Sequence, residues 1–231
     1  TAAKRRRSDD AYTPGGKAGR RPDRATIVYS RKLRQLYPDS NIVIGGLEAS
    51  LRRFAHYDYW DNAVRPSILL DSQADLLLYG MGEKVITQLT QRLRQGEALE
   101  TIRDLRGCCY LCRQEEIPQD SVSCASFHKV SENKESYAKA HQIQTEWQDA
   151  VYGKTIVQKQ TDTLYLVQNP PMPSLTREEL DEVFDLPFTR TYHPSYEAMG
   201  GVDAIKEVEF SIIQNLSLIH ISEPTRLGMI S

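Results

Sequence analysis

The sequence predicts a mixed α/β fold that contains part of a doubly wound parallel sheet. Residues 42–44 and 76–79 are short apolar runs with the length and composition of strands buried on both faces. Glycines end both runs abruptly, and a clear amphipathic helix follows the second run. A strand, a glycine turn and a helix form the βα half of a parallel unit, so we expect a layered α/β domain.

The composition is that of an ordinary soluble protein with one large or two small domains. The 231 residues are 40% hydrophobic and 26% charged, with a formal net charge of -2. No apolar run approaches the ~20 residues of a membrane helix. Balanced charge argues against a broadly electrostatic nucleic-acid binder, and the basic residues 4–7 are typical of a solvated terminus. Four cysteines, three of them bunched, do not resemble a secreted disulfide framework, so we expect a cytoplasmic protein.

A loop, a helix and a strand are predicted at the start of the chain. Residues 13–22 are rich in glycine and proline and predict the loop. The helix opens at Pro22 and ends before Pro38, and the strand 42–44 follows. Apolar residues recur at helical spacing along this helix: Ala25, Tyr29, Leu33 and Leu36. Residues 47–54 are compatible with either a loop or a helix.

The second strand leads into the amphipathic helix. This helix begins at Glu83, and its apolar face carries Val85, Ile86, Leu89 and Leu93. Residues 107–112 predict a third strand, and three strands in this pattern make about half of a doubly wound sheet. A parallel sheet without its outer strands leaves an unpaired edge and an uncovered apolar face. We therefore expect the isolated chain to be marginally stable or prone to aggregation.

The second half of the chain is predicted to combine helices with a hairpin. Residues 113–130 show no regular pattern. Ser131 then caps a helix with an apolar face of Tyr137, Ala140, Ile143 and Trp147. Residues 155–157 and 163–167 predict a β-hairpin, and a proline-rich linker follows.

The strongest helix signal begins at Thr176. Thr176 and Glu179 have the spacing of a capping box, and the helix is predicted to end at Pro187. A turn at His193-Pro194 follows. Residues 207–213, with the sequence EVEFSII, predict one last buried strand.

The two glycine turns supply the candidate binding residues. These are Gly45, Gly46 and Glu48 after the first strand, and Gly80, Gly82 and Glu83 after the second. Ligands of doubly wound domains bind beyond the carboxyl ends of the strands, where the two carboxylates suit a ligand hydroxyl or amide. Carboxylates also favour helix N-termini because of the helix dipole, which is the alternative interpretation. The turns lack the third glycine of a dinucleotide fingerprint, so no NAD site is predicted.

The cysteines do not predict a metal site, although a Cys-x-x-Cys pair is present. Such a pair can bind zinc or iron–sulfur clusters or carry redox chemistry. Cys109 and Cys112 fall with Cys108 in a predicted strand, where residues three apart point to opposite faces. Cys124 has no partner at a suitable spacing. We interpret all four as small buried hydrophobic residues.

Five long stretches, which run from residue 6 to residue 197, carry a resemblance to a known family. They are RRSDDAYTPGGKAGRRPDRATIVYS (6–30), IGGLEASLRRFAHYDYWD (44–61), ADLLLYGMGE (74–83), LVQNPP (166–171) and LPFTRTYHPSYE (186–197), and the short Leu70-Asp71 segment adds to them. Together they resemble the YgiQ-type radical S-adenosylmethionine proteins, with a match from about residue 1 to 214. This family carries an N-terminal domain similar to cobalamin-binding Rossmann domains. A radical SAM barrel that binds a [4Fe-4S] cluster and S-adenosylmethionine follows it.

The resemblance implies a domain organisation. Residues 1–112 would form a partial Rossmann-like domain, residues 113–200 a connecting region with helices and a hairpin, and residues 201–214 the start of the barrel. The turns at Gly45-Gly46 and at residues 80–83 lie where cobalamin-type domains carry ligand-facing loops. The Asp-x-His-x-x-Gly motif that supplies a lower cobalt ligand in some of these domains is absent, which argues against cobalamin.

The resemblance ends near Asn215. In the family, the strand that matches 207–213 leads into an Arg-Gly-Cys-x-x-x-Cys-x-x-Cys loop, whose thiolates hold three irons of the cluster. Here residues 215–231 contain no cysteine, and LSLIHISEPTRLGMIS resembles a translated sequencing-adapter read-through. We therefore expect an internal fragment of a radical SAM enzyme that is inert alone. Its partners would be the remainder of its own barrel and an unknown substrate.

Two other classes of function stay open from the sequence. A non-catalytic α/β module would hold a nucleotide or a corrinoid through the Gly45 and Gly80 loops, with saturable binding that needs no cluster. A nucleic-acid-binding protein that uses residues 4–7 would bind with a steep salt dependence. The balanced charge of the remaining chain disfavours this last class.

Overall fold

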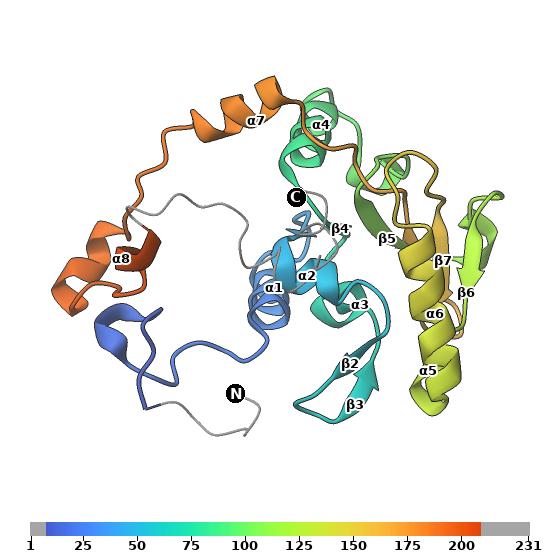
Figure 1. Cartoon of the computed structure of the whole chain (residues 1–231), viewed down its shortest axis with the longest axis horizontal. Coiled ribbons are helices and arrows are strands. Elements are labelled where there is room, and N and C mark those ends of the chain that lie inside the picture. The colour runs from blue at the N-terminus through green and yellow to red at the C-terminus, as the bar shows by residue number, and fades with distance from the viewer. Residues whose placement is uncertain (1–7, 209–231) are drawn as a thin grey trace, which may run out of the picture. The chain divides into compact units, whose positions relative to one another are not determined.

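The computed structural model describes residues 8–208, which fall into two compact units. One unit, here called the terminal unit, contains the described residues 8–22 and 186–208. The other, here called the sheet unit, spans residues 23–185. Figure 1 labels the elements of both units along the chain.

The sheet unit is built on a six-stranded sheet with the order β1-β4-β5-β8-β7-β6. Its strands are β1 (Val43–Ile44), β4 (Leu76–Leu78), β5 (Cys108–Cys112), β6 (Val122–Cys124), β7 (Ile156–Lys159) and β8 (Tyr165–Gln168). β1 runs parallel to β4, and β6 runs parallel to β7, whereas the other three neighbouring pairs are antiparallel. The predicted mixed α/β class is confirmed, with a Rossmann-like parallel unit at β1 and β4.

β5 departs from the doubly wound pattern, because it runs antiparallel to β4. The amide of Tyr79 donates to the carbonyl of Gly107 at 2.9 Å, so β5 begins at the edge where β4 ends. The helix α4 (Glu83–Arg94) comes between the two strands. The chain then returns to this edge, with the side chains of Leu99, Ile102 and Leu105 buried in the core. The expectation of a third strand in a parallel pattern is therefore wrong, since periodicity predicts a strand but not its direction.

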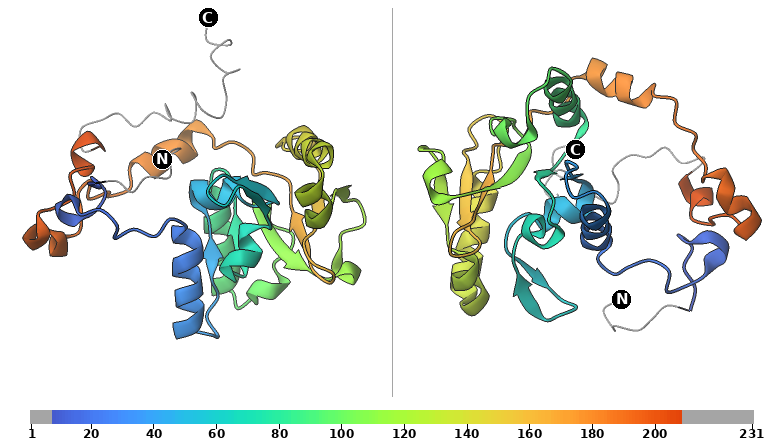
Figure 2. Two further views of the ribbon diagram at one scale, coloured as in Figure 1. Left: turned by 90° about the horizontal axis from the view of Figure 1, so that it is seen from below. Right: turned by 180° about the vertical axis from the view of Figure 1, so that it is seen from behind.

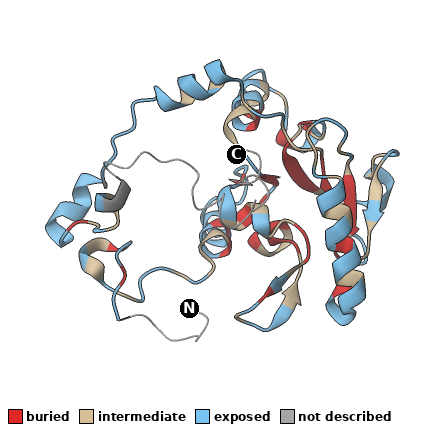
Figure 3. Ribbon diagram, viewed as in Figure 1, coloured by how far each residue is buried: buried red, intermediate tan, exposed pale blue. Residues whose placement is uncertain are grey.

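Helices cover both faces of the sheet. On one face, residues of α1 (Ala25–Leu36), α2 (Gly46–Leu51), α3 (Ile68–Ser72) and α6 (Lys134–Glu146) share a core with Leu77 and Cys109. On the other face, α4 and the 3-10 turn η2 (Leu99–Thr101) pack over Leu76, Leu78 and Cys108. Alternation of side chains along each strand creates the two layers. Figure 3 shows the buried residues gathered on the strands and on the inner sides of the helices.

Most local predictions in the sheet unit are confirmed. The first helix, the two parallel strands and the hairpin of β7 with β8 form where the sequence places them. The ambiguous residues 47–54 begin as the helix α2. The capping box opens α7 (Arg177–Phe184), because Thr176 Oγ1 accepts the amide of Glu179 while Glu179 accepts the amide of Thr176. This helix ends at Phe184, shortly before the predicted Pro187.

The segment predicted to be irregular, residues 113–130, is in fact partly regular. It contains β6 and most of α5 (Phe127–Glu132), and Ser131 lies inside α5 rather than at a cap. The cap of α6 is Asn133, whose Oδ1 accepts the amide of Ser136 at 2.9 Å. β6 owes its order to parallel pairing with β7, a distant segment, which local sequence patterns do not reveal. A second small sheet, the hairpin of β2 (His56–Asp58) and β3 (Ala63–Arg65), was also not predicted.

The terminal unit holds three short elements: η1 (Pro14–Gly16), η4 (Pro194–Met199) and α8 (Ile205–Val208). The amide of Gly15 donates to the carbonyl of Gly201 at 2.9 Å, which joins the two chain segments. The predicted strand 207–213 begins inside α8, so its first two residues are helical, and residues 209–213 lie outside the described chain.

The described residues 8–208 form short helices and a six-stranded sheet shared by both halves of the chain. None of their helices has both the length and the apolar composition that crossing a membrane requires. The six-stranded sheet takes strands from residues 1–112 and from residues 113–200 alike. The domain ranges that the family resemblance implies stay predictions.

Candidate functional site

The two glycine turns lie at one edge of the sheet, because they follow the parallel strands β1 and β4. Gly46 and Gly80 adopt φ of 77° and 71°, a left-handed conformation that favours glycine. A Cβ on Gly45 would lie 3.3 Å from the carbonyl oxygen of Leu78, so this turn passes close to β4. The amide of Gly80 donates to Ser50 Oγ of α2 at 3.2 Å. This bond ties the second turn to the helix that follows the first.

Glu48 lies in α2, and both of its carboxylate oxygens have partners within the chain. Oε2 accepts the hydroxyl of Thr26 at 2.8 Å and the Thr26 amide at 3.3 Å, while Oε1 accepts Arg52 Nη1 at 2.9 Å. Thr26 is the second residue of α1, so Glu48 satisfies a free amide at the N-terminus of that helix. The carboxylate thus joins α2 to α1. Its predicted role in ligand binding stays a prediction.

Glu83, the first residue of α4 after Gly82, differs from Glu48. Its Oε2 is buried and has no hydrogen-bond partner among the described residues. Polar atoms that are buried without a partner are rare in proteins and carry a desolvation cost. Of the six residues that sequence analysis placed at this edge, Glu83 is the one with a carboxylate oxygen that has no hydrogen-bond partner among the described residues.

Arg53, which follows α2, organises a polar cluster behind the two turns. Its Nε donates to Gln168 Oε1 of β8, and its Nη2 donates to Gln148 Oε1 at 3.0 Å. The guanidinium also lies 4.9 Å from the centre of the Tyr79 ring, a cation–π contact. Gln168 is fully buried, and its Nε2 has no partner among the described residues. Burial raises the pKa of Tyr79, whose hydroxyl donates to the carbonyl of Asn169.

Sequence reasoning did not connect these residues. The signal was present as the LVQNPP stretch, in which two amide side chains end an apolar strand. Gln168 of β8 pairs with Cys109 of β5, which pairs with Leu77 of β4, so the three side chains lie on the same face of the sheet. Their convergence depends on the antiparallel pairing of β5 with β8, which the sequence alone does not give.

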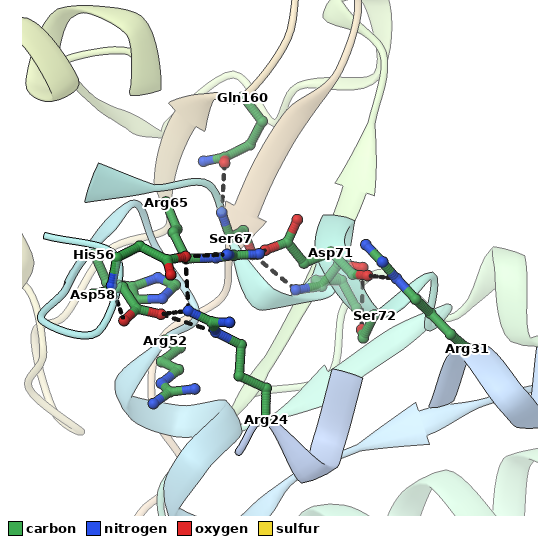
Figure 4. A network of polar contacts seen from close by, with 12 residues as sticks. Arg24, Arg31, Arg52, His56, Asp58, Arg65, Ser67, Asp71, Ser72 and Gln160 are labelled. Carbon is green, nitrogen blue, oxygen red and sulfur yellow. Dashed lines mark hydrogen bonds and ion pairs between the residues drawn. The ribbon is translucent and has the colours of Figure 1, made fainter. Parts of the chain in front are cut away.

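A second polar network joins α1, the β2–β3 hairpin and α3, as Figure 4 shows. Arg24 lies 2.8 Å from Asp58 and 2.7 Å from Asp61. Arg65 lies 2.8 Å from Asp61 and 2.7 Å from Asp71. Each of these five charged side chains has an oppositely charged partner inside the chain. We interpret the network as structural, because it holds α1, the β2–β3 hairpin and α3 together.

The pKa values in this network follow from the pairing. Burial raises the pKa of Asp58, but the hydrogen bonds from Arg24 and from the amides of Trp60 and Asp61, with the positive charge of Arg24, together outweigh it, and the net pKa lies below the usual value. The hydrogen bonds from Arg24 and Arg65 also lower the pKa of Asp61. Burial lowers the pKa of His56, whose Nδ1 lies 3.1 Å from the carbonyl oxygen of Phe54. The imidazole is therefore neutral at pH 7.

The cysteines do not fit an iron–sulfur cluster. Cys108 and Cys112 belong to the core on one face of the sheet, and Cys109 belongs to the core on the other, as the alternation of a strand predicts. Burial raises the pKa of Cys108 and Cys124 to about 12 and that of Cys112 to about 11, so these thiols stay protonated. Among the described residues, no group of three or more histidine, cysteine, aspartate or glutamate side chains is placed to hold a metal ion.

Comparisons with known proteins assign the chain to a family. The family described as Radical SAM N-terminal matches residues 1–211. A UPF0313 protein of Clostridium botulinum (strain 657 / Type Ba4) is 58% identical over 212 residues, which are 92% of this chain and 33% of the relative. A UPF0313 protein of Clostridium perfringens (strain ATCC 13124) is 52% identical over 216 residues, which are 93% of this chain and 32% of the relative.

The chain spans about a third of the length of the curated relatives it matches. No solved structure matches it. The family match covers both units of the described chain, from the loop at Asp10 to the helix α8. The chain therefore belongs to the radical SAM N-terminal family.

Proposed function

We propose that this chain is the N-terminal module of a YgiQ-type radical SAM enzyme. In the full-length protein, the segment beyond the matched region would bind a [4Fe-4S] cluster and S-adenosylmethionine. That cofactor pair supplies a 5′-deoxyadenosyl radical by reductive cleavage of S-adenosylmethionine. The observation that carries the proposal is the family match over residues 1–211, in a chain that covers 33% of its Clostridium botulinum relative.

The residues of the module support the proposal that the cluster is bound outside it. The thiols on β5 are buried on opposite faces of the sheet, so they supply no ligand set for the cluster. All four cysteines are free, which agrees with a reducing cytoplasm. The substrate of the parent enzyme stays unknown. The module by itself is proposed to be catalytically inert.

Anaerobic reconstitution with iron and sulfide tests this proposal. We expect the 231-residue chain to gain no stable [4Fe-4S] absorption and to form no 5′-deoxyadenosine from S-adenosylmethionine and a reductant. The full-length Clostridium botulinum relative, treated in parallel, should gain the cluster and form 5′-deoxyadenosine. A stable cluster on the 231-residue chain would contradict the proposal that the cluster is bound outside this module. A full-length relative that binds iron and sulfide but never cleaves S-adenosylmethionine would contradict the proposed chemistry.

A second candidate function, a ligand-binding module, is favoured by one observation. The turns after β1 and β4 meet at one edge of the sheet, where Glu83 Oε2 has no partner among the described residues. A nucleotide or a corrinoid held there would bind without a cluster. Titration of the chain with S-adenosylmethionine and with cobalamin distinguishes the two candidates. Saturable binding that Glu83→Gln weakens and Glu48→Gln does not would support the second candidate, whereas the absence of binding supports the first.

A further inference from the structure

The first helix presents its apolar face outward. Sequence periodicity places Ala25, Tyr29, Leu33 and Leu36 on one face of α1, the face expected to enter the core. In the structure, Tyr29 is 56% exposed, Leu33 is 47% exposed and Leu36 is 58% exposed. Val28, next to them on the helix surface, is 46% exposed. The side of α1 that the sequence makes most apolar is therefore not part of the described core.

The inward face of α1 is held largely by polar contacts. Arg31 Nε donates to the carbonyl of Asp71 at 2.6 Å, and Arg34 lies 2.7 Å from the carboxylate of Asp75. Only Ile27 and Ser30 are buried on this helix. On a helical wheel these four inward residues lie opposite the apolar face. The orientation of α1 is thus fixed by specific hydrogen bonds, and rotating the helix to bury its leucines would break them.

The exposed apolar side chains of α1 are a candidate interaction surface. Burial of such side chains is favourable, and contiguous exposed apolar patches commonly mark interaction sites. Lys32 is the single charged residue on the face that carries Val28, Tyr29, Leu33 and Leu36. The neighbouring helix α2, grouped with α1 in both views of Figure 2, exposes Leu47 and Leu51 as well.

We propose that the α1 face formed by Val28, Tyr29, Leu33 and Leu36 docks against the part of the full-length family chain that lies outside the segment matched here. The occupant follows from length: the relatives have about two thirds of their residues outside the segment that this chain matches. The matched segment is 33% of one relative and 32% of the other, so the remaining residues belong to the same polypeptide in both. An apolar face with one lysine suits a permanent contact within one polypeptide. The two surfaces of such a contact never separate, so neither of them has to be polar enough to face water.

Cysteine labelling of residue 33 tests the docking. Leu33→Cys is placed in the 231-residue chain and in a full-length chimera, in which residues 1–211 replace the matching segment of the Clostridium botulinum relative. We expect a maleimide to label the chimera at least tenfold more slowly than the chain alone. Lys139→Cys, on the exposed side of α6, is the matched control and should label at similar rates in both proteins. The four native cysteines are largely buried, and the parent proteins give their background.

Equal labelling of Leu33→Cys in the two proteins would overturn the proposal. Protection already present in the 231-residue chain, together with a dimeric mass in solution, would also overturn it by assigning the face to a second copy. The proposal takes the full-length chain from the proposed function but not its chemistry. A chimera that forms 5′-deoxyadenosine while residue 33 stays accessible would contradict the docking alone, and protection without 5′-deoxyadenosine would contradict the chemistry alone.

A second measurement needs no chimera. Side-chain footprinting compares the full-length Clostridium botulinum relative with its own segment that matches residues 1–211. We expect the helix that matches α1 to be modified several-fold less in the full-length protein. Equal modification of this helix in both would overturn the docking even if the chimera failed to fold.

Discussion

The sheet unit and the terminal unit are stabilised in different ways. Every buried hydrophobic side chain of the described chain lies between Ile27 and Val167, inside the sheet unit. The buried side chains of the terminal unit are polar, namely Asp10 and Thr13. Burial of apolar area is the dominant favourable term in folding, so the two units have unequal resistance to unfolding.

Specific polar contacts take the place of a core in the terminal unit. Arg21 Nε donates to Asp10 Oδ2 at 2.7 Å, and its guanidinium lies 5.0 Å from the centre of the Tyr12 ring. Thr13 Oγ1 lies 2.7 Å from the carbonyl oxygen of Lys17. A neutral hydrogen bond such as that of Thr13 contributes only about 0.5–1.5 kcal/mol net, and the pair of Asp10 with the half-exposed Arg21 is weakened by solvent screening. The unit therefore depends on backbone geometry that a single side chain can disrupt.

The difference can be measured because both tryptophans, Trp60 and Trp147, lie in the sheet unit. Their fluorescence reports the unfolding of that unit alone. Proteolysis at the chain ends reports the terminal unit. We expect substitutions in the sheet core to move the first signal, and substitutions in the terminal unit to move only the second.

The largest effect is expected from Leu77→Ala in the sheet unit. Leu77 is fully buried on β4 between β1 and β5. Removing a buried leucine side chain leaves a cavity and costs about 2–5 kcal/mol of the free energy of unfolding. Denaturant titration followed by tryptophan fluorescence measures this loss.

Leu47→Ala is the matched control, since Leu47 is 61% exposed on α2. It should change the free energy of unfolding by no more than about 0.5 kcal/mol. If the two substitutions had equal effects, the assignment of stability to the sheet core would be wrong.

A smaller loss is expected from Asp58→Asn in the network of Figure 4. The Asp58 side chain is 1% exposed and pairs with Arg24, so the substitution leaves the guanidinium with only the more exposed Asp61 as a charged partner. Hydrogen bonds to charged groups contribute about 1.5–3 kcal/mol, and we expect a loss in that range at pH 7. Asp61→Asn, which removes the more exposed partner of the same arginine, should cost less.

The pH dependence of this effect has a defined sign. The pKa of Asp58 is lower in the folded chain than its usual value, so the unfolded chain takes up a proton first as pH falls. The stabilisation by Asp58 is complete above the unfolded pKa of about 3.9 and is lost as pH falls through the folded pKa. The difference in stability between the parent chain and Asp58→Asn should therefore shrink below about pH 4. A difference that grew on acidification would contradict the pairing.

Local sequence signals predicted the elements whose order is decided locally. The capping box at Thr176 and the glycine-ended strands before Gly45 and Gly80 formed where expected, because their determinants lie within a few residues. The direction of β5 and the existence of β6 did not follow from such signals. Both depend on partners far along the chain, β8 and β7.

The burial of side chains was also predicted only where local sequence determines it. The alternation of β5 correctly predicted that Cys109 and Cys112 enter opposite cores. The outward face of α1 was not predicted, because periodicity shows that a helix has an apolar face but not which surface covers it. Arg31 and Arg34, which hold α1 in place, carry no recognisable pattern in the sequence.

The smallest effect on the sheet unit is expected from Gly15→Ala in the terminal unit. Gly15 has φ of 65°, and a Cβ there would lie 2.5 Å from the carbonyl oxygen of Met199. The segments of η1 and η4 would have to separate. We expect faster proteolysis of both chain ends, while the tryptophan transition stays within about 0.5 kcal/mol of the parent chain.

Gly16→Ala separates the clash from the backbone strain. Gly16 has nearly the same conformation, with φ of 68°, but nothing lies within 4 Å of a Cβ there. Both substitutions pay about 1–2 kcal/mol for a left-handed residue, and only Gly15→Ala adds the collision with Met199. Proteolysis should therefore accelerate more in Gly15→Ala than in Gly16→Ala. Equal acceleration would mean that the close approach of η1 to η4 does not hold the terminal unit together, and a shift of the tryptophan transition would mean that the two units unfold as one.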